Sequence, residues 1–212
     1  TYSDSGLSAS TAYSYTVRAC DAAGNCSAPS SPASATTLAP GQYVSAPVLD
    51  PAFNLIANSL ATTLDVATVF GNQDPGMLVA GVTSNVVSVW KWNATQQRWA
   101  FYSPQLTAGG IIAYAAAHNY DVLSVVNPGE GYWVNAIAPV TLPAQAGAGF
   151  NWDAASFAAL PSGFNLITTA DILTPTQFNA AVSATPPAPG VVPTDNFFTL
   201  WSPVDMLEEG TT

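Results

Sequence analysis

The sequence predicts a mainly β, α+β protein in which a partial β-sandwich is followed by a repeated small antiparallel-sheet module with a short helix. Three observations lead to this prediction. Apolar residues alternate from Tyr13 onward, which indicates a strand with one buried face. The segment VWKWN-ATQQ-RWAFY, residues 89–102, has the pattern of a β-hairpin. Two short motifs recur at one fixed displacement, which is typical of a repeat.

The first 37 residues form the predicted partial sandwich, with strands expected over residues 13–20 and 26–37. The spacer DAAGN between Cys20 and Cys26 suits a hairpin turn, because Gly and Asn tolerate the positive φ that such turns need. The two cysteines are therefore expected to form a disulfide, which implies an oxidising compartment. The alternatives are two free thiols or half of a metal site, but a chain with one histidine offers few metal partners.

A family resemblance supports this interpretation. Leu7, the alternation from Tyr13, the AxDxxGNxS motif and the closing SATT strand together resemble the last third of a bacterial fibronectin type III domain over residues 1–38. The resemblance implies that Tyr13 occupies a tyrosine corner, with its hydroxyl bonded to the chain near Leu7, and that the cysteines clip the last hairpin. A full sandwich of this type needs about 100 residues and seven strands, whereas about three strands fit here.

The rest of the chain is predicted to be a repeat. Two motifs recur at the same displacement along the chain. The first, Phe53-Asn54-Leu55-Ile56, recurs as Phe164-Asn165-Leu166-Ile167, and the second, Val89-Trp90, recurs as Leu200-Trp201. The predicted organisation is the partial sandwich over residues 1–38, a linker over 39–47, copy 1 over 48–143 and copy 2 over 144–212. Copy 2 is expected to be incomplete, because the sequence stops before a counterpart of GEGYWVN.

Copy 1 is expected to combine strands with short helices. FNLIA is predicted to be a strand, TLDVATVFG a helical turn, and GGIIAYAAAHNY a helix that Asn119 ends. The strands LSVV and GYWVNAIA, joined by residues 127–131, complete the unit. The pattern NLI, VWKWN, QRWAFYSP and NPGEGYWVN resembles a module found in tandem in large secreted bacterial proteins, often beside fibronectin type III domains. That family is identified by its pattern and has no assigned activity, and the resemblance implies an extracellular or cell-surface location.

Composition excludes several classes of partner. The net charge is −10, from 13 acidic residues against three basic ones, so no basic patch is available for nucleic acid or an anionic lipid surface. Charged residues make up 8% of the chain, against about 25% in ordinary globular proteins, and such surfaces are common in secreted proteins. No apolar run reaches the ~18 residues of a membrane span.

The sequence predicts no catalytic chemistry. His118, the one histidine, is expected in the last turn of a helix, where a capping or surface role is favoured over catalysis. Glu130 lies in a GEG turn without an evident second carboxylate, so a solvated turn is favoured over general acid catalysis. Neither a GxSxG nor a DxDxDG pattern occurs, so we expect no enzyme, no metal and no cofactor. Calcium is the weakest of these exclusions, because single aspartates together with loop carbonyls can bind it.

The aromatic hairpin is the remaining candidate for a binding site. Trp90 and Trp92 share one strand face, while Trp99 and Phe101 share a face of the partner strand. Such a row could stack against sugar rings, and the candidate stacking residues are Trp90, Trp92, Trp99 and Tyr102. A cross-strand aromatic core is the alternative, and it is the more frequent fate of large aromatic residues in a small module.

Two main functional hypotheses follow. The first is a non-catalytic extracellular protomer that assembles into a filament, sheath or surface layer by strand pairing between copies of its incomplete β domains. Its candidate assembly surface comprises Tyr13, Tyr15, Val17, Phe197 and Trp201. The alternative is a glycan-binding accessory region of a secreted polysaccharide-degrading enzyme or adhesin, with the tryptophan hairpin holding polysaccharide. An enzyme in its own right is the least favoured hypothesis.

Overall fold

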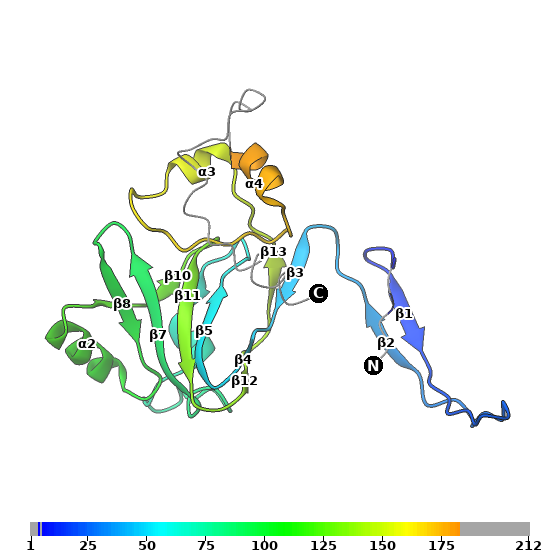
Figure 1. Cartoon of the computed structure of the whole chain (residues 1–212). Helices are drawn as coiled ribbons and strands as arrows, with labels where there is room; N and C mark the ends of the chain where they lie inside the picture. The colour runs from blue at the N-terminus through cyan, green and yellow to red at the C-terminus, as the bar shows by residue number, and fades with distance from the viewer. Residues whose placement is uncertain (1–3, 5, 183–212) are drawn as a thin grey trace. The chain divides into compact units, whose positions relative to one another are not determined.

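A computed structural model of the chain describes residue 4 and residues 6–182 (Figure 1). The chain divides into two compact units, with the boundary between Gln42 and Tyr43. Most of the described regular structure is β, in several small sheets accompanied by short helices. The expected mainly β, α+β class is therefore confirmed.

The first unit holds a two-stranded antiparallel sheet, in which β1 (Ala12–Tyr15) pairs with β2 (Ala33–Thr36). The expectation of longer strands over 13–20 and 26–37 is wrong. Beyond Tyr15, serine hydroxyls accept the backbone N–H groups of Val17 and Ala19, and these N–H groups therefore form no regular ladder with backbone carbonyls. The two segments stay adjacent through scattered bonds, among them that from Ser30 N to Val17 O at 2.9 Å.

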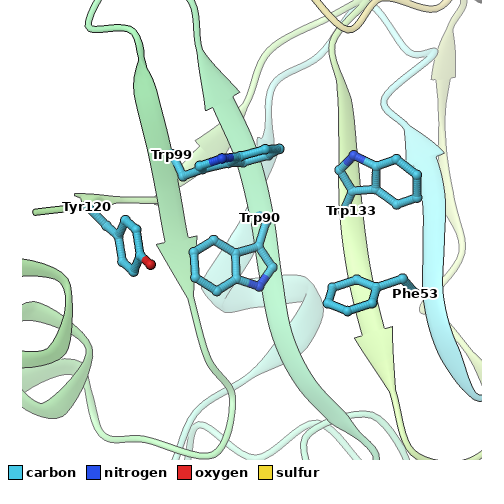
Figure 2. A pocket seen from close by; sticks show the side chains of 5 residues that line it. All are labelled: Phe53, Trp90, Trp99, Tyr120 and Trp133. Atoms are coloured by element: carbon cyan, nitrogen blue, oxygen red, sulfur yellow. The ribbon is translucent and has the colours of Figure 1, made fainter. Parts of the chain in front are cut away.

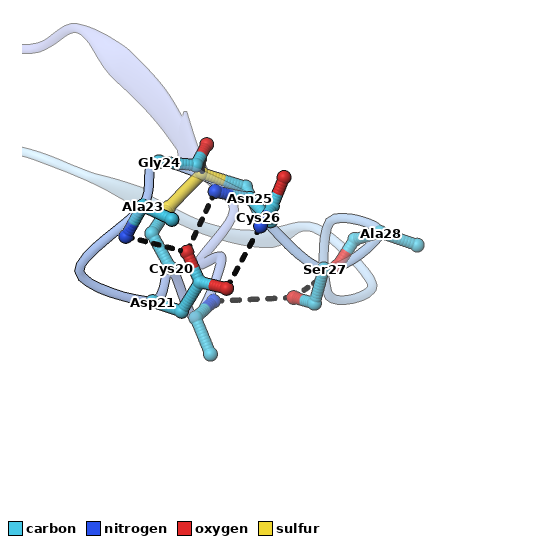
Figure 3. The surroundings of a disulfide bond; sticks show 9 residues. Cys20, Asp21, Ala23, Gly24, Asn25, Cys26, Ser27 and Ala28 are labelled. Atoms are coloured by element: carbon cyan, nitrogen blue, oxygen red, sulfur yellow. Dashed lines mark hydrogen bonds between the residues drawn. A yellow bond between two sulfur atoms is a disulfide. The ribbon is translucent and has the colours of Figure 1, made fainter.

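The tip of this unit is closed by the predicted disulfide between Cys20 and Cys26, which the structure confirms (Figure 3). Asp21 organises the turn between them. Its carboxylate accepts hydrogen bonds from the Asn25 side chain and from the backbone N–H groups of Asn25 and Ala23, each at 2.9 Å. The bond from the Asn25 side chain, followed by those from the backbone, lowers the pKa of Asp21. The turn is thus held both by the disulfide bond and by the hydrogen bonds to the Asp21 carboxylate.

Tyr13 makes the hydrogen bond expected of it. Its hydroxyl accepts the backbone N–H of Ser8, next to Leu7, at 2.9 Å, so this part of the prediction is confirmed. On the same unit Val17 is 72% exposed and Tyr15 is also exposed. Within the described residues, the apolar strand face of the first unit is therefore accessible to solvent.

The second unit is built on a five-stranded sheet in the order β5 (Ala52–Ala57), β11 (Gly131–Ala136), β7 (Val86–Asn93), β8 (Arg98–Tyr102) and β9 (Asp121–Val122). The first three pairings are antiparallel, and β8 pairs with β9 in parallel. The predicted hairpin is confirmed, with Trp92 opposite Trp99. The last strand of the main sheet in sequence order, β11, lies between β5 and β7.

The main hydrophobic core covers one face of this sheet. Tyr132 of β11 meets Phe70 of α1 (Val66–Phe70) edge to face, with 6.4 Å between ring centroids. Asp65 caps α1 by accepting the N–H of Thr68 at 2.7 Å. Both aromatic residues of this pair are fully buried, so the core holds α1 firmly on the sheet.

The expected helix is α2 (Ala108–Ala117), which lies beside β8 and β9 (Figure 1). Thr107 starts it by accepting the N–H of Gly110, and Asn119, with φ of +57°, follows its end as predicted. Buried Ile111 and Ala115 anchor the helix in the main core.

Three short ladders surround the main sheet. They pair β6 (Leu64–Asp65) with β10 (Val125–Val126), β4 (Val48–Leu49) with β12 (Val140–Thr141), and β3 (Gln42–Ser45) with β13 (Gln145–Ala148). The expected LSVV strand is thus reduced to β10, which pairs with β6 instead of joining the main sheet. Part of the segment expected as a linker forms β3.

The start of copy 2 adds a small satellite core. Trp152 packs there with Phe178 and Val182, helped by α3 (Ala154–Ala158) and α4 (Pro175–Val182). This segment is tied to copy 1 by the bonds Gly131 N to Leu166 O and Thr168 N to Gly129 O, both 2.9 Å. The candidate assembly residues Phe197 and Trp201 lie outside the described residues.

The two recurring FNLI segments also share local backbone geometry. The side-chain amide of Asn54 donates to the carbonyls of Asp50 and Ala52 at 2.8 and 3.1 Å. Asn165 donates to the carbonyls four and two residues before it at the same two distances. Ala52 has φ of +98° and its counterpart Gly163 has φ of +101°. The two FNLI segments are therefore entered through the same turn.

Ala52→Gly, which copies the residue found in copy 2, is expected to stabilise the second unit by about 0.5–1 kcal/mol. A non-glycine residue in a left-handed conformation costs about 1–2 kcal/mol of stability. Glycine removes this cost, but part of the gain is lost because glycine gives up more chain entropy on folding. The urea midpoint of unfolding measures the effect. Ala57→Gly in the same strand is the control and should lower the midpoint; a similar fall for Ala52→Gly would contradict the prediction.

Candidate functional site

A groove of about 550 Å³ lies on the face of the main sheet opposite the core (Figure 2). Five aromatic residues line it, and each comes from a different neighbouring strand or from the residue that precedes one: Phe53 of β5, Trp133 of β11, Trp90 of β7, Trp99 of β8, and Tyr120 just before β9. Its volume falls within the range of small-molecule sites.

Strand alternation places these side chains on one face. In β11, Tyr132 and Val134 are buried in the core, so Trp133 between them points to the opposite face. Trp133 pairs directly with Trp90 across β11 and β7. The aromatic row is therefore a consequence of register, because a shift of one residue in either pairing would send one tryptophan into the core.

Trp90 forms a fixed part of the groove. Its ring centroid lies 4.8 Å from that of Phe101 and 5.0 Å from that of Tyr120, and its Nε1–H donates to Ser88 Oγ at 2.9 Å. The ring of Trp99 stands at 89° to it, 6.4 Å away. These ring contacts hold the aromatic residues in place before any ligand binds.

Phe53 is the most exposed member of the groove. Its side chain is 61% exposed, and its counterpart in copy 2, Phe164, is 51% exposed. Only Phe53 of the two lines the described groove, so its position beside Trp133, and not its exposure alone, makes it a candidate contact.

Charged residues of the sheet lie on the face opposite the groove, because Lys91 alternates with Trp90 and Trp92 and Arg98 precedes Trp99. Lys91 Nζ is 2.6 Å from Glu130 Oε2, and that oxygen also accepts the N–H of Asn127 at 2.7 Å. The expectation of a solvated turn at Glu130 is therefore wrong, since its carboxylate is partly buried and ion-paired. Arg98 forms a second ion pair with Asp121.

His118 has the predicted capping role. It ends α2, and its Nδ1 lies 2.8 Å from the carbonyl oxygen of Tyr114. Its ring is stacked on that of Tyr114 at 4.1 Å and lies 5.9 Å from that of Tyr120. The imidazole is thus part of an aromatic stack that borders one end of the groove.

The structure divides the four candidate stacking residues. Trp90 and Trp99 line the groove. Trp92 lies on the same face, packed edgewise on Trp99 at 5.5 Å, but outside the lining. Tyr102 lies on the core face, where its hydroxyl donates to Gly71 O at 2.7 Å and burial raises its pKa. The geometry leaves no stacking role for Tyr102.

Sequence reasoning missed Phe53, Tyr120 and Trp133. The alternation in GYWVN indicates that Trp133 faces away from Tyr132 and Val134, so the sequence predicts the sheet face on which Trp133 lies. The pairing of β11 with β7, which brings Trp133 next to Trp90, leaves no local signal in the sequence.

Within residues 6–182 and residue 4, no group of three or more His, Cys, Asp or Glu side chains is placed to hold a metal ion. In the same part of the chain, no helix has both the length and the apolar character needed to cross a membrane.

Comparison with known proteins gives one short similarity. A segment of exoglucanase B from Cellulomonas fimi is 59% identical to this chain over 46 residues. That segment covers 22% of this chain, and the chain spans only 4% of the length of the exoglucanase. No family model matches the chain, and no solved structure resembles it significantly.

Proposed function

We propose that the second unit binds a neutral polysaccharide in the aromatic groove, as a non-catalytic accessory region of a secreted polysaccharide-degrading protein. The observation that carries the proposal is the groove itself, a row of five exposed or half-buried aromatic residues on the sheet face opposite the core. Aromatic rings offer flat apolar surfaces, which complement the apolar faces of pyranose rings.

The electrostatics favour a neutral ligand. The five residues that line the described groove carry no charge, and the chain as a whole has a net charge of −10. A polyanion would lack a counter-charge in the groove and would be repelled by the protein at low salt. Neutral chains meet neither obstacle.

Two observations support the accessory role. Glu130 is the one glutamate in the sequence of residues 48–143, and its carboxylate is ion-paired with Lys91, so it is not available as a free acid. The similarity to exoglucanase B covers a small fraction of that enzyme, which is the pattern expected of a shared accessory segment. The disulfide between Cys20 and Cys26 supports an extracellular location.

The comparison with exoglucanase B favours this function over the filament hypothesis. The exposed Val17 and Tyr15 leave an apolar strand face in the first unit, but nothing in the described residues identifies a second copy as its cover. No comparison supports assembly into a filament, and we do not propose it.

Binding to insoluble cellulose and to soluble neutral β-glucans tests the proposal, with polygalacturonate as the anionic comparison. Trp99→Ala should weaken binding about 10-fold or more, as is typical when a central aromatic contact is lost, while keeping the fold because the core lies on the other face. Ile112→Ala, an exposed apolar change on α2, is the control and should bind like the parent protein. Failure of the parent protein to bind any neutral polysaccharide would refute the proposal.

A further inference from the structure

The five groove residues form an oblique row across the strands. Trp133 and Trp90 lie at one level because they are paired. Phe53 pairs with Asn135, two residues beyond Trp133, so it lies to one side of that level. Trp99 pairs with Trp92, two residues beyond Trp90, and therefore lies to the other side. The row thus crosses the sheet from β5 to β9 as a diagonal.

The spacing of the strands that carry the row suggests how a ligand lies on it. Neighbouring strands are about 4.8 Å apart, so the four steps from β5 to β9 span about 19 Å across the sheet. The advance per ring in an extended pyranose chain is close to this inter-strand step. We infer that the groove binds a single extended chain of about four to five neutral sugar rings, running across the strands with roughly one ring per strand. This inference rests on the proposed function of the groove.

The geometry also selects the linkage. Rings joined through equatorial oxygens, as in β-1,4-linked chains, form an extended ribbon that can contact residues on five successive strands. An α-1,4-linked chain curves into a helix, so it would leave the row after one or two rings. Phe53 stands exposed at one end of the row and Tyr120 lies at the other, which makes the two end contacts separable.

The test is a calorimetric titration of the 212-residue chain with β-1,4-linked glucose and xylose oligosaccharides of two to six rings. Affinity should rise severalfold with each ring up to four or five rings and then level off. Maltohexaose, which is α-1,4-linked, should bind at least about 10-fold more weakly than the β-1,4-linked hexamer, the equivalent of one lost aromatic contact.

Two outcomes would overturn the inference while leaving the proposed function in place. The first is oligomer affinity that is already maximal at two rings. The second is binding to neutral polymers without binding to any of the oligomers, which would indicate a site for a polysaccharide surface. Failure to bind the polymers as well would instead refute the proposed function.

Variants at one end of the row test whether the bound oligosaccharide extends across the strands as far as Phe53. Phe53→Ala should lower the affinity for five-ring oligomers severalfold, leave that for three-ring oligomers within about twofold, and bring the plateau one ring earlier. Phe164→Ala is a matched control, because this residue has the same turn and similar exposure but does not line the groove. Equal losses for three-ring and five-ring ligands in Phe53→Ala would overturn the assignment of Phe53 to the end of the row.

Discussion

Replacing Gly71 with alanine is expected to destabilise the second unit by about 3–5 kcal/mol. Gly71 ends α1 with φ of +68° and ψ of −176°, a conformation that is essentially restricted to glycine and costs other residues about 1–3 kcal/mol. A Cβ there would also overlap Thr83 Oγ1 and Met77 O and lie 2.9 Å from Val79 N. Relieving this crowding by moving the neighbours costs about 1–3 kcal/mol more.

Thr83 makes the overlap hard to relieve. Its hydroxyl donates to Phe70 O at 2.9 Å and accepts the N–H of Val79 at 2.8 Å, so displacing it breaks buried hydrogen bonds. Urea unfolding measures the effect. Gly76→Ala is the matched control, because Gly76 has φ of +80° and a Cβ there would meet no atom within 4 Å. If the two variants lost the same stability, steric crowding at Gly71 would be excluded as the cause.

The contacts around Gly71 also support the groove, from the core face of the sheet. Gly71 O accepts the Tyr102 hydroxyl, and Tyr102 follows Phe101, on which Trp90 packs at 4.8 Å. The core face of β8 is therefore fixed to α1, while its other face holds groove residues in place. A rigid sheet with one buried and one aromatic face is the kind of scaffold on which a preorganised binding surface depends.

The local elements of this fold could be predicted because they follow from short-range patterns. The alternation in VWKWN and RWAFY indicates the β7–β8 hairpin, and Asn119 marks the end of α2. The same alternation places Tyr102 on the face opposite Trp99, so its inclusion among the stacking residues was avoidable. The spacer between Cys20 and Cys26 was sufficient to predict the disulfide.

The groove itself could not be predicted in full, because it depends on long-range pairing. Asn54 faces Val134 across β5 and β11, eighty positions apart in the sequence, and this pairing brings Phe53 beside Trp133. Hydrophobic periodicity says which side of a strand is buried but not which strand lies next to it. The length of the strands in the first unit depended on serine hydroxyls that compete for backbone N–H groups, which a pattern of apolar residues does not reveal.

The joint between the two copies should be broken by Gly129→Ala, with a loss of about 2–4 kcal/mol confined to the satellite core. Gly129 has φ of +77°, and a Cβ there would lie 2.7 Å from Trp152 Cζ2 and overlap the ring of Phe150. Backbone strain and crowding therefore act together at a turn whose carbonyl accepts the N–H of Thr168. The satellite core is small, so a loss of this size should open it while the five-stranded sheet remains folded.

Hydrogen exchange measures this separation. In the Gly129→Ala variant, the Thr168 amide and the Trp152 Nε1–H, which donates to Thr168 O at 2.8 Å, should lose their protection, whereas the amides of β7 and β11 should keep theirs. Gly81→Ala is the matched control, because Gly81 has φ of +72° and open space around it. Since the groove lies on the main sheet, sugar binding should survive the substitution. Slow exchange at Thr168 in both variants would show that the Gly129 turn does not hold the start of copy 2 to copy 1.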